Sequence, residues 1–148
     1  MPTIEWNEVG NWVGKETGVS DWLLLDQERV NKFADATGDH QWIHVDVERA
    51  TKEMGGPIVH GYLTLSLIPG LGAGMLSLNG TTRGINYGSN KIRFMNMVKV
   101  GKRVRLRQKL VNAEPKAGGL QLTNECTIEI EGETKPALIA ETITVVFN

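Results

Sequence analysis

The chain contains a single cysteine, Cys126, among its 148 residues. One cysteine cannot form an internal disulfide, so an exported disulfide scaffold is excluded and nothing calls for an oxidising compartment. No apolar run reaches the roughly 18 residues that a membrane-spanning helix needs. The N-terminal residues have neither a basic start nor an apolar segment, so they do not resemble a signal peptide. We therefore expect a cytoplasmic protein that makes no membrane contact.

A large excess of charge of either sign is also missing, because 16 Lys and Arg oppose 17 Asp and Glu. The pI near 6.3 argues against general nucleic-acid binding, which favours strongly basic domains. Eight of the 16 basic residues nevertheless fall between Lys91 and Lys109, a stretch without any acid. Arg103, Arg105 and Arg107 alternate there with apolar residues and would share one face of a strand. That face is either a solvated sheet surface or a site that attracts an anionic ligand.

Internal repeats and low-complexity linkers are absent as well, so we expect a single domain over residues 1–148. Helical spacing predicts helices over 27–37 and 47–54, with Asp and Gly residues suited to cap their ends. We expect an ordered loop over 38–45 between them. Residues 61–76 are apolar nearly all round and predict a buried helix, kinked and weakened by its proline and glycines.

From Arg83 onward the hydrophobic period changes to two, which predicts successive strands, with a further strand near residues 19–25. Helices that precede an antiparallel meander indicate an α+β fold rather than a doubly wound sheet. One buried helix on one face of a curled antiparallel sheet is the simplest packing of these elements. Edge strands would then be exposed unless a second subunit pairs with them, so we expect a dimer.

Four titratable residues, Asp39, His40, His44 and Asp46, crowd into eight positions beside the apolar segment. Such a cluster on a loop is the best functional signal in the chain, and four interpretations compete for it. The spacing of His40 and His44 suits a metal site, although the segment follows a helix-closing glycine and lacks the usual glutamate. The second interpretation is nucleophilic catalysis by Cys126 or a serine, but the sequence gives no sign that either nucleophile is activated.

The third interpretation is structural, with Asp39 and Asp46 as turn and cap residues and the histidines satisfied by neighbours. The fourth is general acid and base catalysis, in which Asp39 and His44 flank a bound water in a partly dry pocket. This chemistry needs a group that stabilises negative charge on an electrophile. Gly61 begins the apolar segment, and its amide would be an unpaired donor that no side chain blocks. Such donors contribute roughly 3 to 4 kcal/mol to a developing oxyanion, but Gly61 could also serve only a tight turn into the helix.

Two segments carry motifs that occur together in one known family. Asp39 and His44 form an Asp-x-x-x-x-His pair within Ala-Thr-Gly-Asp-His-Gln-Trp-Ile-His-Val-Asp, and His60 and Gly61 form a His-Gly pair within Gly-Pro-Ile-Val-His-Gly-Tyr-Leu-Thr. The chain thereby resembles the MaoC-like hydratases and dehydratases, which include the (R)-specific enoyl-CoA hydratases. Residues 84–94 and the basic strand after them resemble the subgroup related to nodulation protein N.

The resemblance implies a hot-dog fold, in which an antiparallel sheet wraps around a long central apolar helix and two subunits form a homodimer. It implies a site at the subunit interface that takes an acyl thioester, with the fatty tail in an apolar tunnel and the CoA near the surface. The family commonly has Asn-Pro where this chain has His40 and Gln41, and Trp42 is bulky. The geometry of this loop and the width of the tunnel are therefore the properties in which this chain can differ from the rest of the family.

The expected function is (R)-specific hydration of trans-2-enoyl-CoA to (R)-3-hydroxyacyl-CoA and the reverse dehydration. Asp39 and His44 would be catalytic, with His44 the base because its ordinary pKa of roughly 6.5 suits neutral pH. The Gly61 amide would hold the thioester oxygen, and the resemblance implies further substrate contacts at Tyr62, Asn86 and Trp42. No cofactor or metal is required by this chemistry.

Two other functions on the same fold remain open. An acyl-CoA thioesterase would use a carboxylate and water against the carbonyl carbon and release free CoA. A non-catalytic acyl-thioester-binding subunit would keep the tunnel without needing Asp39. An acyl carrier protein could also replace CoA as the carrier, in which case the basic segment would be a docking face for that acidic partner.

Overall fold

The computed structural model describes residues 3–148. Within this part of the chain, a six-stranded sheet runs in the order β2-β6-β7-β8-β5, with β3 also pairing with β6, and every pairing in it is antiparallel. Its strands are β2 (Glu16–Val19), β3 (Leu23–Leu24), β5 (Arg83–Phe94), β6 (Arg103–Lys116), β7 (Gly119–Ile130) and β8 (Leu138–Phe147). The α+β class is confirmed, and β6, β7 and β8 form the predicted meander, whereas β5 crosses over to pair with β8 instead of β6. The single domain over 1–148 stays a prediction.

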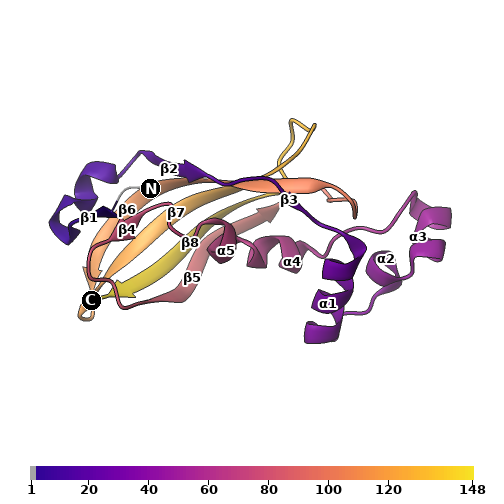
Figure 1. Ribbon diagram of the computed structural model, residues 1–148, viewed down its shortest axis with the longest axis horizontal. Helices are drawn as coiled ribbons and strands as arrows, with labels where there is room; N and C mark the ends of the chain where they lie inside the picture. Colours follow the sequence, from indigo (N-terminus) through magenta and orange to yellow (C-terminus); the bar gives the residue numbers. More distant parts are fainter. Residues whose placement is uncertain (1–2) are drawn as a thin grey trace.

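The strands of the sheet are long and curved, as Figure 1 shows. Helices α4 (Gly61–Ser66) and α5 (Ile68–Leu71) lie along it, and α1 (Gln27–Thr37), α2 (Trp42–Val45) and α3 (Val47–Met54) gather at one end. A 3-10 helix, η1 (Trp6–Trp12), lies at the other end with the short parallel pair β1 (Thr3–Ile4) and β4 (Ser77–Leu78). The sequence analysis did not foresee η1, whose seven residues carry no clear helical period.

Helices α1 and α3 are confirmed together with their predicted caps. The Asp26 side chain accepts a hydrogen bond from the Arg29 amide at 2.9 Å, and Gly38 ends α1 in the left-handed conformation at φ 82°. Asp46 caps α3 in the same way, and Gly55 ends it. The segment between the two helices was expected to be a loop throughout, yet residues 42–45 form the single turn α2. Four residues are too few to show a hydrophobic period, so only the tertiary fold reveals this turn.

The central apolar segment is helical but divided, since α4 ends at Ser66 and α5 covers only Ile68–Leu71. Pro69 has no N–H to donate to the preceding turn, and the glycines that follow weaken a helix. The predicted kink is therefore a break, and residues 72–76 leave the helix altogether. Leu63 and Ile68 still bury their side chains in the main hydrophobic core together with Leu106 and Ile128 of the sheet.

Strand β5 forms one edge of the sheet and pairs with β8 alone among the described strands. All 12 of its residues are exposed, including the apolar side chains of Ile85, Tyr87, Ile92 and Phe94. A long, apolar edge strand is open to pairing with another chain. No helix in residues 3–148 is long and apolar enough to cross a membrane.

Candidate active site

The turn after α1, helix α2 and the approach to α4 bring Asp39, His44 and His60 together. One side-chain nitrogen or oxygen of each of these residues lies within 4.8 Å of those of the other two. Asp39 is exposed, whereas His44 and His60 are buried. Residues from two motifs far apart in the sequence thus form one cluster, with a carboxylate on its solvent side and two imidazoles inside.

His44 has its tautomer fixed by the backbone. Its Nδ1 lies 2.6 Å from the carbonyl oxygen of Ile58. A carbonyl oxygen can only accept a hydrogen bond, so Nδ1 carries the proton and donates it. Nε2 of the neutral ring is therefore left with a free lone pair, as a general base requires.

His60 supports both members of the predicted catalytic pair. Its Nε2 donates to the backbone oxygen of Asp39 at 3.0 Å, and its ring stacks on that of His44 with centroids 3.9 Å apart and planes 25° from parallel. Phe33 packs on His60 at 4.8 Å between ring centroids. The sequence analysis treated His60 only as part of the His-Gly motif, because its role depends on contacts across the fold rather than on spacing.

The stacked arrangement speaks against a metal ion shared by the two histidines. An imidazole lone pair lies in the plane of its ring, so two nearly parallel rings direct their lone pairs side by side rather than at one point. His60 also has its Nε2 committed to Asp39, while its Nδ1 is buried without a hydrogen-bond partner in residues 3–148. The geometry favours acid and base chemistry at Asp39 and His44 over metal binding.

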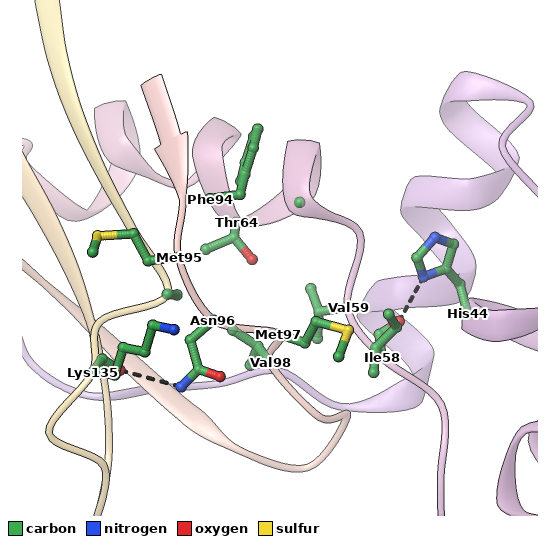
Figure 2. Close-up of a pocket in the computed structure, with 12 residues that line it drawn as sticks. His44, Ile58, Val59, Thr64, Phe94, Met95, Asn96, Met97, Val98 and Lys135 are labelled. Carbon is green, nitrogen blue, oxygen red and sulfur yellow. Dashed lines mark hydrogen bonds between the residues drawn. The ribbon is translucent and has the colours of Figure 1, made fainter. Parts of the chain in front are cut away.

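A pocket of about 470 Å³ opens beside His44. Gly61 and Thr64 of α4, Phe94 at the end of β5, and Lys135 also line it. Figure 2 shows His44 at one end of this pocket and Lys135 with Asn96 at the other. Thr64, Asn96 and Lys135 were missed by the sequence analysis, since they come from separate segments and belong to no motif.

The other predicted substrate-binding residues are dispersed. Asn86 lines a second pocket, of about 830 Å³, beside α5. Tyr62 is 71% exposed and meets the edge of the Phe94 ring, with centroids 6.0 Å apart. Trp42 lies under the guanidinium of Arg49, whose carbon is 4.1 Å from the ring centroid. Tyr62 and Trp42 line neither pocket, so their substrate contacts stay predictions.

Cys126 has the surroundings of a core residue rather than of a nucleophile. It is fully buried on β7, and its thiol lies 3.6 Å from the Thr142 hydroxyl. Burial, the largest influence, raises the pKa of this thiol, which disfavours the reactive thiolate. His40, the other histidine of the loop, points away to Asp35, with 2.9 Å between Nε2 and the carboxylate.

The basic strand β6 is largely paired with acids. Glu129 accepts hydrogen bonds from Arg105 at 2.7 Å and from Arg107 at 2.8 Å, and Arg107 also reaches Glu16 at 2.6 Å. The bond from Arg107 is the main reason why the pKa of Glu129 lies below its ordinary value. This pairing favours the interpretation of a solvated sheet surface, and contacts between these arginines and a phosphate stay a prediction.

A wrapped antiparallel sheet with an Asp–His pair beside a helical His-Gly defines the class of hot-dog hydratases and dehydratases. Residues 8–129 match the model of the MaoC like domain. The chain belongs to this MaoC-like dehydratase family, as its motifs predicted, and it is a hydro-lyase.

Individual relatives agree with this assignment. The chain is 51% identical to 3-hydroxyacyl-thioester dehydratase Z of Mycobacterium tuberculosis, over 88% of this chain and 87% of that protein. It is 45% identical to nodulation protein N of Rhizobium leguminosarum, over 99% of this chain and 93% of that protein. Among solved structures, the (R)-hydratase from A. caviae involved in PHA biosynthesis shares 25% identity, with a TM-score of 0.73 over 89% of this chain and 94% of that chain.

Proposed function

We propose that the protein adds water to trans-2-enoyl thioesters, giving (R)-3-hydroxyacyl thioesters, and catalyses the reverse dehydration. His44 Nε2 takes a proton from a water held by Asp39, and the water oxygen bonds to C3. The electron pair of the double bond moves toward the thioester oxygen, which the Gly61 amide stabilises. A proton returned to C2 on the same face completes the addition. CoA is the proposed carrier.

The tautomer of His44 is the observation that carries this proposal. Because Nδ1 donates to the carbonyl oxygen of Ile58, the lone pair of the neutral ring is on Nε2, the atom proposed to act as the base. The base lies in the same pocket as Gly61, so one bound thioester can meet both groups. A side chain on Gly61 would lie 3.1 Å from the Phe94 ring, which shows how closely the ring covers this position.

The exposed edge of β5 supports a homodimer as the working form. Its apolar side chains continue onto Met95 and Met97, which are 37% and 67% exposed and line the pocket of His44. A second copy that covers this edge would close the pocket from the side. Ile85→Glu would test the assembly, since a charge at an exposed apolar position of that edge should convert the dimer to a monomer in analytical ultracentrifugation. A cytoplasmic location belongs to the same proposal and is testable by cell fractionation.

The central experiment follows the absorbance of the conjugated thioester with crotonyl-CoA and a longer enoyl-CoA. Asp39→Asn and His44→Ala should each lower the rate by about 10²-fold or more, because each removes a group that handles the proton or the water. His40→Gln is the matched control, since it changes a histidine of the same loop that faces Asp35 instead of the pocket. Its rate should stay near that of the wild type.

Two outcomes would favour the other functions. Release of free thiol at a rate matching loss of the thioester would indicate a thioesterase. Binding of acyl-CoA with no change of the double bond, for every chain length, would indicate a non-catalytic subunit. Hydration of enoyl groups only when they are carried on acyl carrier protein would replace CoA as the carrier and retain the reaction.

A further inference from the structure

The second pocket, beside α5, is distinct in composition from a simple channel for a hydrocarbon tail. Apolar side chains from α4, α5 and β5 form part of its wall, including Leu65, Ile68 and Ile92. Seven polar residues also line the pocket, six of them on strands of the sheet and one, Ser66, on α4. We call these the polar belt: Ser66, Asn86, Ser89, Gln108, Asn124, Thr142 and Thr144.

Strand register explains why the belt is continuous. Asn124 of β7 pairs with Thr142 of β8, and Thr142 in turn pairs with Ser89 of β5. Thr144 pairs with Asn86 one step along the same two strands. Directly opposite residues in neighbouring strands have their side chains on the same face of the sheet. Five belt residues thus form a single strip across the adjacent strands β7, β8 and β5, and the other two, Gln108 and Ser66, lie on β6 and α4.

Most of the belt has hydrogen-bonding capacity to spare. Thr142 contacts the Cys126 thiol, and Gln108 donates to Thr17 at 3.1 Å. For the side chains of Asn86, Asn124 and Thr144, by contrast, no hydrogen bond to another group is found within residues 3–148. A hydrocarbon tail would displace water from these groups without forming hydrogen bonds to them, which weakens binding.

The two pockets follow one another along the same elements. Thr64 lines the pocket of His44, and the next residues of α4, Leu65 and Ser66, line the second pocket. On β5, Phe94 lines the pocket of His44 and Ile92 lines the second pocket. From Gly61 to Ile68, the start of α5, the path is roughly 10 Å at about 1.5 Å per helical residue. A chain held at Gly61 would therefore reach the polar belt with its distal carbons only.

We propose that the second pocket takes an acyl chain bearing a hydroxyl or similar hydrogen-bonding group on its distal part, and that the polar belt selects for it. This inference rests on the proposed function for the position of the thioester. A distal hydroxyl both donates and accepts, so it can pair with the amides and hydroxyls of the belt. Short enoyl chains end before the belt, so their binding does not depend on it.

The test is calorimetric titration with two saturated ligands, decanoyl-CoA and ω-hydroxydecanoyl-CoA, which bind without reacting. The wild type should bind the hydroxylated chain about tenfold more tightly, a difference that one or two neutral hydrogen bonds provide. Asn124→Leu and Thr144→Val remove belt groups while keeping similar side-chain volume, and each should reduce this preference. Together they should abolish it.

Thr127→Val is the matched control, because Thr127 belongs to β7 as Asn124 does but lies outside the lining of the pocket. It should keep the wild-type preference. Melting temperatures establish that each variant is folded. Equal affinity of the wild type for both ligands, or a preference that survives in the double variant, would overturn the inference. Failure to hydrate crotonyl-CoA would count against the proposed function instead, because the titration involves no reaction.

Discussion

Replacing Gly61 by alanine separates the chemistry of the site from its packing. The new methyl carbon would lie 3.1 Å from two atoms of the Phe94 ring, so the half-exposed ring must shift by a few tenths of an ångström. We expect the overpacking, about 1 kcal/mol, to be largely offset by the better helix propensity of alanine, also up to about 1 kcal/mol. The melting temperature should then change by no more than about 4 °C.

The loss of activity should be far larger than the loss of stability. The methyl group would occupy the approach to the Gly61 amide, and loss of one oxyanion donor lowers kcat by about 10² to 10³-fold. The assay is hydration of crotonyl-CoA beside thermal unfolding of the same preparation. Gly70→Ala is the matched control, because a methyl carbon there meets no heavy atom of residues 3–148 within 4 Å. It should keep full activity and gain slightly in stability.

A second substitution provides the refutation. Phe94→Leu in the Gly61→Ala background relieves the crowding but leaves the methyl in front of the amide. Stability should recover in the double variant while activity stays low, relative to Phe94→Leu alone. Recovery of activity together with stability would refute the assignment of Gly61 as an oxyanion donor, because crowding of the ring would then explain the whole effect.

Three further predictions concern single side chains near the site. His60→Phe should lower kcat while leaving the fold intact, since it loses the donor to the Asp39 carbonyl but keeps the stack; His60→Gln, which can restore an N–H donor, should recover part of the rate. Cys126→Ala should retain activity, and iodoacetamide should not modify the native thiol; inactivation by the reagent in the folded state would contradict this. The pKa of His40 is raised mainly by its hydrogen bond to Asp35, so the pair stabilises the fold fully below the unfolded pKa of about 6.5 and loses this effect as pH rises through the folded pKa. His40→Gln should therefore lower the melting temperature at acidic pH and leave it unchanged in alkali; a pH-independent difference would be evidence against the pair.

Local chemistry made much of this fold predictable. The Asp26 side chain caps the start of α1, and Gly38 ends this helix in a left-handed conformation that glycine adopts readily. The period-two pattern of apolar residues predicts the strands of the second half. The family motifs predict a site formed by Asp39, His44 and Gly61, and the structure has Asp39 close to His44, which lines the same pocket as Gly61. These features depend on near neighbours or on motifs retained as a unit.

Features that depend on distant contacts were not accessible in this way. The stack of His60 on His44 joins residues from separate segments, and no spacing rule encodes it. The contact of the Arg49 guanidinium with the Trp42 ring likewise depends on how two helices pack, and the substrate contact expected of Trp42 stays a prediction. No sequence pattern marks the polar belt, because its residues come from several segments and each strand by itself has an ordinary sequence.

The break between α4 and α5 has a consequence for how this protein can diversify. Gly61, the proposed oxyanion donor, begins α4, whereas Pro69 belongs to α5 and lines the distal pocket together with Gly72, which follows α5. A substitution after Leu67 can reshape the distal pocket without turning α4. Because Leu65 and Ser66 of α4 also line that pocket, we expect substitutions in α5, rather than in α4, to change the acyl group that is accepted while the chemistry is kept.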